Sequence, residues 1–513
     1  MLTKVYGSAV FGVEATTITV EVNVDIGIGY HLVGLPDVAI KESNFRIAAA
    51  LQNNGYKIPG KKLILNMSPA DLRKEGSAYD LTLATGILIA TGQITEMNPL
   101  EEYIIMGELS LDGSLQPIRG ALPIALKAKE EGFKGFILPN QNAKEAAIVE
   151  GIDVFGIDSI KEVIEFFDKN IPLEKTVVDM EAEFYTQLEH PEFDFSDVKG
   201  QESIKRCMEI AAAGGHNIIL IGPPGSGKTM LAKRLPSILP PMSLHESLET
   251  TKIHSVAGRT LERGGIMTAR PFRSPHHTIS DVALVGGGTY PQPGEISLAH
   301  NGVLFLDELP EFKRGVLEVM RQPLEDRDVT ISRAKFTVTY PSSFMLVASM
   351  NPSPSGYFND PDAPVTSSPA EMQRYLSKIS GPLLDRIDIH IEVTPVPFEK
   401  LSEERKGESS NLIRERVTKA RKIQTERFLM FENIHYNAQM GVKQIRQFCK
   451  LDEASLQLLK TAMERLNLSA RAYDRILKVA RSIADLEASE EITGSHISEA
   501  IQYRSLDREG WFG

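Results

Sequence analysis

Hydrophobic and polar residues alternate strictly from Thr17 to Ile26, with isoleucine or valine at every second position. This period of two predicts a β-strand with one buried face. The next pattern, from Asp37 to Asn54, has a helical period, follows a proline and stops before a glycine. We expect the inward face of this helix to carry Val38, Phe45, Ala48 and Leu51.

Similar patterns continue to about residue 170. Further strands are predicted at 62–67, 103–107 and 135–138, and helices at 79–91 and 122–131. Residues 1–170 therefore read as an α/β or α+β domain. Residues 171–196 are irregular, acidic and interrupted by prolines, which is typical of a linker.

The remainder of the chain changes character near residue 396. Residues 197–396 alternate strand and helix patterns, which predicts a parallel sheet with covering helices. Residues 397–513 are almost entirely helical in period. Mixed charges between Lys400 and Arg427 favour a solvated helix face over a nucleic-acid patch. We expect an α/β fold with a C-terminal helical domain.

Composition narrows the class of protein. With 513 residues the chain is too long for one hydrophobic core. The net charge of −12 excludes a wholly basic surface, although a local basic channel for nucleic acid remains compatible with it. Cys207 and Cys449 are the two cysteines, which argues against a disulfide framework. No apolar run reaches the roughly 20 residues of a membrane span, so we expect a cytoplasmic protein without membrane contact.

A glycine-rich run separates the apolar stretch Asn217 to Ile221 from a helical pattern. It reads Gly222, Pro223, Pro224, Gly225, Ser226, Gly227, Lys228 and Thr229. This is the spacing of a P-loop, whose backbone N–H groups surround a triphosphate. Lys228 is then expected to reach the β- and γ-phosphates, and Thr229 to ligate Mg²⁺. The predicted cofactors are ATP and Mg²⁺.

A second apolar run, Gly302 to Leu306, ends in Asp307 and Glu308. Adjacent side chains on a strand point to opposite sides. We therefore expect Asp307 to support the Mg²⁺ shell and Glu308 to face the attacking water. A strand followed by two acids also fits a simple strand-end cap, but its combination with a P-loop favours nucleotide hydrolysis.

A third apolar run, Phe344 to Ser349, leads to Asn351 and a proline. Ligands of open α/β sheets bind at the carboxyl ends of strands. Asn351 is therefore expected to orient water and touch the γ-phosphate, with an Asn that caps a turn as the alternative.

Arg386 lies in the run Leu383 to Asp388, just before a strand pattern. An arginine supplied by a neighbouring subunit can neutralise charge on a transferring phosphoryl group and accelerate hydrolysis by about 10³- to 10⁵-fold. The alternative is a local salt bridge with Asp385 or Asp388.

These motifs together resemble the AAA+ ATPases of the magnesium-chelatase-like branch. Within that branch, the segment Arg270 to Ser280 and the domain order resemble the ComM/YifB family over essentially the whole chain. The resemblance implies a homo-hexamer with ATP between subunits, Arg386 acting in trans, and a further arginine on the C-terminal helical lid. The segment Ser469 to Lys478 matches that lid motif, and we favour Arg471 over Arg475, which lies one turn later.

The segment from Thr251 to His300 is long for a connection between the two Walker motifs. It carries arginines that either follow a phosphate backbone or form structural ion pairs: Arg259, Arg263, Arg270 and Arg273. The pair His276 and His277 is a poor zinc site, because neighbouring side chains diverge and no third ligand is evident.

The N-terminal domain resembles the Lon-type protease fold, also described as ribosomal S5-like. In that motif, Ala78 falls at the nucleophile position and Leu122 at the lysine position. Ser77 with Lys127 or Lys129 is the remaining candidate pair. A serine without an adjacent base is a weak nucleophile, so we expect no protease activity.

The resemblance implies an ATP-dependent motor on single-stranded or branched DNA, with branch migration in recombination or natural transformation as its task. The alternative functions are a chelatase-type or protein-remodelling ATPase acting on a polypeptide partner, an ATP-dependent protease, and a nucleotide-controlled scaffold.

Overall fold

The computed structural model describes residues 2–179, 193–260, 265–288, 291–333, 336–354, 368–396, 407–431, 433–466 and 468–504. The chain forms two compact units. Unit 1 comprises Met1–Gln187 and Leu244–Met267, and unit 2 comprises Leu188–Ser243 and Thr268–Gly513. Within the described part of the chain, no helix combines the length and apolarity needed to cross a bilayer. Half of the predicted linker, residues 180–192 of 171–196, lies outside the described residues.

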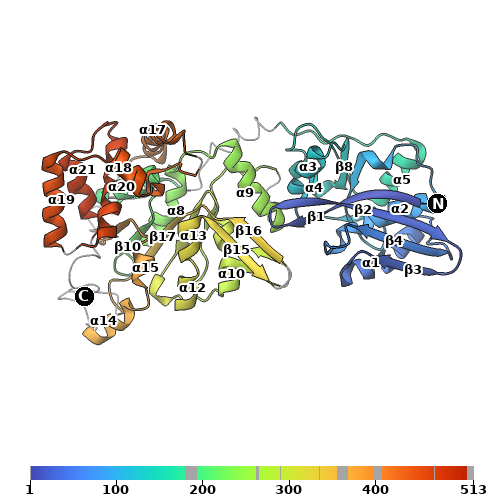
Figure 1. Ribbon diagram of the computed structural model, residues 1–513, viewed down its shortest axis with the longest axis horizontal. Helices are drawn as coiled ribbons and strands as arrows, with labels where there is room; N and C mark the ends of the chain where they lie inside the picture. The colour runs from blue at the N-terminus through green and yellow to red at the C-terminus, as the bar shows by residue number, and fades with distance from the viewer. Residues whose placement is uncertain are drawn as a thin grey trace. The chain divides into compact units, whose positions relative to one another are not determined.

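Unit 1 is built on a mixed seven-stranded sheet in the order β3-β4-β2-β1-β5-β8-β9 (Figure 1). The long strands β1 and β2 pair in antiparallel fashion, and β5, β8 and β9 continue the sheet in parallel. The strand bounds are β1 (Leu2–Phe11), β2 (Glu14–Asp25), β3 (Gly29–Val33), β4 (Lys62–Ser68), β5 (Tyr103–Ile105), β8 (Gly135–Pro139) and β9 (Asp153–Ile157). A small hairpin joins β6 (Glu108–Leu109) to β7 (Leu115–Gln116).

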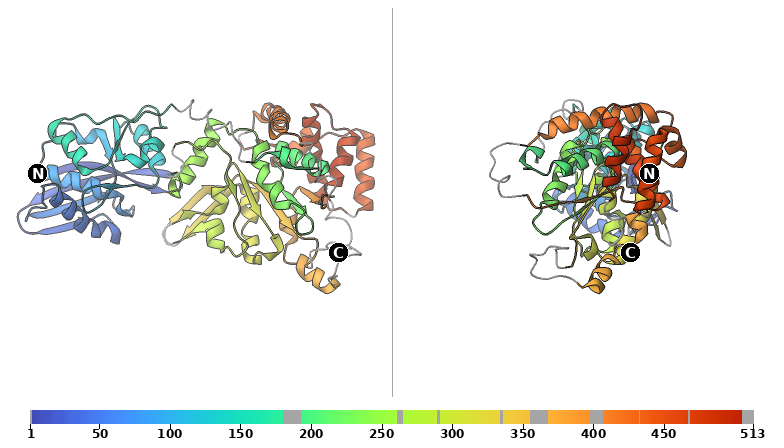
Figure 2. Two further views of the ribbon diagram at one scale, coloured as in Figure 1. Left: turned by 180° about the vertical axis from the view of Figure 1, so that it is seen from behind. Right: turned by 90° about the vertical axis from the view of Figure 1, so that its left-hand side faces the viewer.

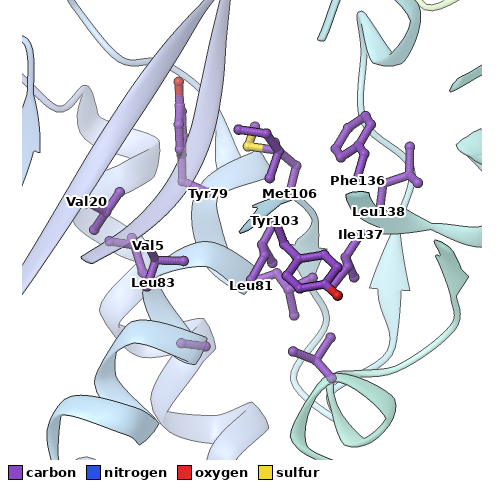
Figure 3. Close-up of a cluster of buried hydrophobic side chains, with 14 of the residues drawn as sticks. Val5, Val20, Tyr79, Leu81, Leu83, Tyr103, Met106, Phe136, Ile137 and Leu138 are labelled. Atoms are coloured by element: carbon purple, nitrogen blue, oxygen red, sulfur yellow. The ribbon is translucent and has the colours of Figure 1, made fainter. Parts of the chain in front are cut away.

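Helices and sheet of unit 1 enclose one continuous hydrophobic core. Its helices are α1 (Val38–Asn53), α2 (Asp80–Ala90), α3 (Ala121–Glu130), α4 (Asn140–Ala146), α5 (Ile160–Lys169) and α9 (Leu244–Val256). Helix α2 is buried along its whole length and packs on β1 and β2. Figure 3 shows side chains from these elements meeting, with Leu81 and Leu83 of α2 between Val5 on one side and Tyr103 and Phe136 on the other. The predicted strands and helices of this region are confirmed to within a few residues.

The inward face predicted for α1 is wrong in part. Val38 is 68% exposed and Phe45 is 74% exposed, whereas Leu51 is buried as expected. The core face instead carries Ile40, Ser43, Ile47, Ala50 and Leu51. An apolar pattern can fit more than one face of a helix, and the packed face here includes the polar residue Ser43 and leaves Phe45 exposed.

A segment from the ATPase half of the sequence completes unit 1. Helix α9 packs against α3, and Ile266 joins the hydrophobic core at 2% exposure. The carboxylate of Glu145, itself 4% exposed, accepts hydrogen bonds from Leu122 N at 2.9 Å, Thr260 Oγ1 at 2.7 Å and Ser255 Oγ. Residues 244–267, which fall inside the predicted ATPase core by sequence, thus belong by packing to the N-terminal unit.

We expect Glu145→Ala to destabilise unit 1 by about 3 kcal/mol or more, because hydrogen bonds to a charged group contribute roughly 1.5–3 kcal/mol each and three buried donors lose their acceptor. Glu145→Gln, which keeps an acceptor oxygen, should lose less. Urea denaturation and amide hydrogen exchange over 244–260 measure the effect, with exposed Glu150→Ala as the control. Unchanged exchange in this segment would contradict the assigned role.

Unit 2 contains a parallel five-stranded sheet in the order β11-β14-β17-β10-β18. Its strands are β11 (Phe272–Arg273), β14 (Val303–Leu306), β17 (Met345–Met350), β10 (Ile218–Ile221) and β18 (Ile389–Glu392). The central strands are buried on both faces, as expected for parallel strands covered by helices. Because these strands are parallel, the P-loop, Asp307 and Asn351 follow strand ends that lie on the same side of the sheet, its carboxyl end. This end, and the opposite amino end, are called the two edges of the sheet below.

Helices of unit 2 share a core with the sheet, and this core extends into the C-terminal helices. The helices around the sheet are α7 (Glu202–Gly214), α8 (Lys228–Ile238), α10 (Asp281–Val285), α11 (Glu295–Leu298), α12 (Arg314–Glu318), α13 (Arg321–Asp326), α14 (Pro369–Leu376) and α15 (Gly381–Leu384). The C-terminal helices, orange to red in Figure 2, are α17 (Ser410–Phe428), α18 (Val442–Phe448), α19 (Glu453–Arg465), α20 (Ala470–Leu486) and α21 (Gly494–Gln502). The predicted helical character of the C-terminal region is confirmed.

Unit 2 also contains two hairpins, each of which forms a separate two-stranded sheet. The larger pairs β15 (Asp328–Arg333) with β16 (Phe336–Pro341), and the smaller pairs β12 (Gly286–Gly287) with β13 (Gln292–Pro293). Tyr340 Oη donates to Pro291 O at 2.7 Å and thereby ties the two hairpins together. No hairpin was predicted between Asp307 and Asn351 from the sequence.

Candidate nucleotide-binding site

The P-loop joins the end of β10 to the beginning of α8. Gly225 and Gly227 adopt left-handed backbone conformations, with φ of 78° and 94°. A side chain would strain both positions, and a Cβ at Gly222 would lie 2.3 Å from Val393 O. The loop needs glycine at these three places in order to curl over the start of α8. Its backbone N–H groups and the positive end of that helix then face the same space.

Lys228 lies under this loop at 9% exposure. Its Nζ donates to Gly222 O at 2.7 Å, to Pro223 O at 2.9 Å and to Asn351 Oδ1 at 3.2 Å. Burial lowers the pKa of this lysine, and the nearby carboxylates of Asp307 and Glu308 oppose that effect. The tertiary structure thus brings the P-loop lysine, both Walker B acids and the predicted sensor Asn351 together.

The predicted Mg²⁺ ligands are in direct contact. Thr229 Oγ1 donates to Asp307 Oδ2 at 2.9 Å, and Asp307 follows the last residue of β14. The hydroxyl of Ser226 is buried and has no hydrogen-bond partner among the described residues. A phosphate oxygen in the loop would supply that partner, and a hydroxyl beside a carboxylate is a donor set that Mg²⁺ accepts. The residues present therefore fit a nucleotide with Mg²⁺.

Glu308 is 54% exposed on its side chain and is held in a left-handed conformation, with φ of 54°. This conformation is uncommon for a residue with a side chain and is often found at functional sites. The Glu308 N–H donates to Asp307 Oδ1 at 3.1 Å and to Ser349 Oγ at 3.3 Å. His277 Nδ1 lies 3.8 Å from the Glu308 carboxylate. Glu308 therefore faces solvent beside the P-loop, as a water-activating carboxylate must.

Arg386 lies at the opposite edge of the same sheet. Asn217, the residue before β10, donates from Nδ2 to Arg386 O at 2.9 Å, whereas the P-loop follows the other end of β10. Four strand residues separate the two edges by about 13 Å. The guanidinium of Arg386 donates to Pro382 O at 2.8 Å and pairs with Glu325. The local salt bridges considered from sequence, with Asp385 or Asp388, are not the ones that form.

Arg471 and Arg475 lie at this same edge. With Arg386 they line a cavity of about 430 Å³ that is also lined by Asn217, Gly302 and Met345, where β10, β14 and β17 begin. Arg471 is 71% exposed and pairs with Asp385, while Arg475 is 24% exposed and donates to Asp388 Oδ1 at 2.8 Å. Ser469 caps α20 as predicted, accepting from Ala472 N.

Asp388 explains why Arg475 is held more firmly. Burial alone would raise the pKa of Asp388, but Arg475 and His216 hold it below its usual value. Asp388 is 2% exposed, and its other oxygen lies 3.0 Å from His216 Nδ1. Breaking a buried ion pair of this kind is costly, whereas an exposed pair contributes little. Arg471 is therefore the arginine that can leave its partner and reach a new anion.

The arginines between the Walker motifs make structural contacts where they are described. Arg273 pairs with Glu295 through two hydrogen bonds, and Arg270 donates to the backbone carbonyls of Pro240, Pro241 and Asn301. Arg263 lies outside the described residues. His276 and His277 stack with ring centroids 4.1 Å apart. The contacts of Arg270 and Arg273 thus support the structural interpretation over a basic substrate-binding loop.

Sequence reasoning missed two groups at this site. Ser349 contacts both Walker B acids, and its signal was a single polar residue inside an apolar strand. His277 stands beside Glu308 and packs edge-on against Phe312, a contact across a loop that has no signal in local sequence.

Three family models match the chain. "Magnesium chelatase, subunit ChlI" covers residues 194–401, "Subunit ChlI of Mg-chelatase" covers residues 20–142, and "Magnesium chelatase, subunit ChlI C-terminal" covers residues 407–504. The chain is 43% identical over 511 residues to the uncharacterized protein YifB of Salmonella typhimurium and 42% identical over 511 residues to the competence protein ComM of Haemophilus influenzae. Both alignments span 99% of this chain and 98% of the relative.

The chain belongs to the magnesium-chelatase-like AAA+ family that includes ComM and YifB. Membership of this family implies ATPase activity, with use of nucleotide and Mg²⁺. The predicted fold class is also confirmed: a P-loop AAA+ core with a parallel sheet, an N-terminal Lon-protease-like domain and C-terminal helices.

The Lon likeness rests on a further relative. The chain is 32% identical over 138 residues to Lon protease 2 of Bacillus subtilis, which is 26% of this chain and 24% of the relative. In unit 1, Ser77 Oγ donates to Glu108, and Lys127 pairs with Glu130 at 3.0 Å and Glu131 at 3.4 Å. Leu122, at the lysine position of the motif, is buried. Ser77 and Lys127 therefore have acidic partners rather than each other.

Proposed function

We propose that this chain is an ATP-driven motor that works as a homo-hexameric ring on single-stranded or branched DNA, as a branch-migration helicase or translocase in recombination or natural transformation. The observation that carries the ring is the position of Arg386. It lies at the sheet edge opposite to its own P-loop and is tied there through Asn217. A nucleotide can meet both the P-loop and Arg386 only between two copies of the chain.

The same proposal includes roles for the remaining site residues. In each copy, the residues from Gly222 to Thr229 bind the phosphates, Thr229 and Asp307 hold Mg²⁺, Glu308 activates water and Asn351 orients it. Arg386 and Arg471 share one cavity, so both serve the nucleotide of the neighbouring copy. Arg471 supplies the lid arginine, and Arg475 holds Asp388 in place.

A hydroxyl row on the β15–β16 hairpin supports DNA as the substrate. Thr330 and Thr339 face each other at 3.2 Å, Ser332 and Thr337 at 3.4 Å, and all four residues are exposed on one side of the hairpin. Serine and threonine hydroxyls are common contacts to phosphate oxygens and carry no base preference. A row of them on the exposed face of a hairpin fits a motor that follows a nucleic-acid backbone. One relative is named as a competence protein, which supports the proposed role in natural transformation.

The test is steady-state ATPase activity with and without single-stranded, duplex and four-way-junction DNA at two salt concentrations. We expect DNA to stimulate hydrolysis and the stimulation to weaken as salt rises, because phosphate contacts release counterions. Thr339→Glu should raise the DNA concentration needed for half-maximal stimulation about tenfold, since it places a negative charge on the hydroxyl row. Thr425→Glu, an exposed change on α17, is the matched control.

A basal ATPase that no DNA stimulates would contradict the DNA motor. It would favour the alternative, a chelatase-type or other protein-remodelling ATPase that acts on a polypeptide partner. The assignment of the nucleotide site would survive that result, because it depends on unit 2 alone.

A further inference from the structure

Ser349 is the one polar residue of β17, whose sequence is Met-Leu-Val-Ala-Ser-Met. The strand is central and buried, and Ser349 has no exposed surface. A hydroxyl in such a place costs free energy unless it makes hydrogen bonds. Ser349 Oγ donates to Asp307 Oδ1 and accepts from Glu308 N at 3.3 Å. One hydroxyl therefore contacts both Walker B acids.

The strand register places the serine there. Strands β14 and β17 run in parallel with Leu306 paired to Ala348, so Asp307 and Ser349 are the next neighbours along the two strands. Ser349 is also paired with Leu220 of β10, one position before the end of the strand that leads into the P-loop. A serine one residue earlier or later on β17 would point to the other face of the sheet.

The two oxygens of Asp307 are thereby held by different groups. Oδ2 accepts from Thr229 Oγ1 at 2.9 Å, while Oδ1 accepts from Ser349 Oγ and, at 3.1 Å, from Glu308 N. The carboxylate plane is fixed before any cation arrives. The N–H of Glu308, which adopts a left-handed conformation, donates to Asp307 Oδ1 and to Ser349 Oγ.

We propose that Ser349 is a positioning residue for ATP hydrolysis, which orients Asp307 for Mg²⁺ and anchors the backbone of Glu308. This inference rests on the roles proposed above for Asp307 and Glu308. Hydrogen-bonding partners behind a metal ligand typically affect metal affinity by 10- to 100-fold. Without the Ser349 hydroxyl, Asp307 Oδ1 keeps only the Glu308 N–H as a donor, and Glu308 N keeps only Asp307 Oδ1 as an acceptor.

The experiment compares Ser349→Ala with the unchanged protein in ATPase assays titrated with Mg²⁺ at saturating ATP. We expect the Mg²⁺ concentration for half-maximal rate to rise roughly 10- to 100-fold. Binding of a fluorescent ATP analogue in EDTA should stay within about twofold, because the phosphate contacts of the P-loop do not involve Ser349. Mn²⁺ should recover more activity than Mg²⁺, since first-row transition metals bind the same oxygen ligands more tightly.

Two matched variants separate positioning from packing. Ser297→Ala removes a fully buried hydroxyl that has no partner among the described residues, so the Mg²⁺ titration should not move. Ser349→Thr keeps the hydroxyl on a β-branched residue suited to a strand. Its Mg²⁺ concentration for half-maximal rate should therefore equal that of the unchanged protein. If Ser349→Ala does not fold, Ser349→Cys, a weak donor of similar size, should give an intermediate shift.

An unshifted Mg²⁺ titration for Ser349→Ala, with normal kcat, would overturn the inference. A lower Tm with the Mg²⁺ requirement unchanged would also overturn it, because that result describes a structural serine. If the unchanged protein shows no Mg²⁺-dependent ATPase activity, the proposed function fails instead, so the two failures are distinguishable.

Discussion

Arg386→Ala is expected to lower kcat for ATP hydrolysis by about 10³-fold or more, because a trans-acting arginine contributes about 10³ to 10⁵ in rate. ATP binding to a single subunit should change little, since Arg386 lies at the sheet edge away from its own P-loop. Single-turnover hydrolysis and binding of a fluorescent ATP analogue measure the two effects. Arg446→Ala, an exposed arginine on α18, is the control.

Mixing distinguishes action in trans from action in cis. A Lys228→Ala subunit lacks its own nucleotide site but still carries an intact Arg386 for its neighbour. Mixed with Arg386→Ala subunits, it should restore part of the turnover at hybrid interfaces. Turnover that stays absent at every mixing ratio would rule out the trans arrangement. Arg471→Ala should follow the same complementation pattern, because Arg471 lines the same cavity.

Glu308→Gln is expected to slow hydrolysis by about 10²- to 10⁴-fold while ATP binding is retained, because the amide cannot take a proton from the attacking water. Gln keeps the size of Glu and leaves the N–H contacts of residue 308 in place. Lys228→Ala makes the contrast: it removes the ammonium beside Asn351 and should abolish binding itself. A filter-binding assay and a phosphate-release assay on both variants separate the two effects.

Full turnover by Glu308→Gln would show that another group activates the water. His277, 3.8 Å from the carboxylate, would then be the first residue to examine. The expected result is instead a protein that holds ATP without hydrolysing it. Such a variant would also be the form in which a nucleotide-bound ring is most easily isolated.

The segment around Arg386 is linked to helix α20 by two ion pairs. Asp385 and Asp388 flank Arg386 in sequence, and each pairs with a different arginine of α20. The segment that carries Arg386 is therefore attached to the C-terminal helices at two points. Movement of those helices in one copy would move the residues that face the nucleotide of the next copy.

The sequence by itself determined where the P-loop lies and predicted a nucleotide site there. A P-loop needs glycines, a lysine and a threonine at fixed spacing within one turn. Because these residues are neighbours in the chain, the sequence is enough to predict the loop. The Walker B acids and Asn351 were predictable for the same reason, because each follows an apolar run that must be a buried strand. The Lon-like N-terminal fold was predicted from a sequence motif, and the helical C-terminal region from the helical period of its apolar residues.

Tertiary structure alone decided which distant residues meet. The register of β14 against β17 pairs Asp307 with Ser349, and the packing of 244–267 on Glu145 moves that segment into unit 1. The packing of α1 buries Ser43 and leaves Phe45 exposed. These outcomes depend on hydrogen bonds and packing between segments far apart in the chain. The local pattern of apolar and polar residues predicts which residues are buried. The residues that they contact are decided only when distant strands and helices pack together.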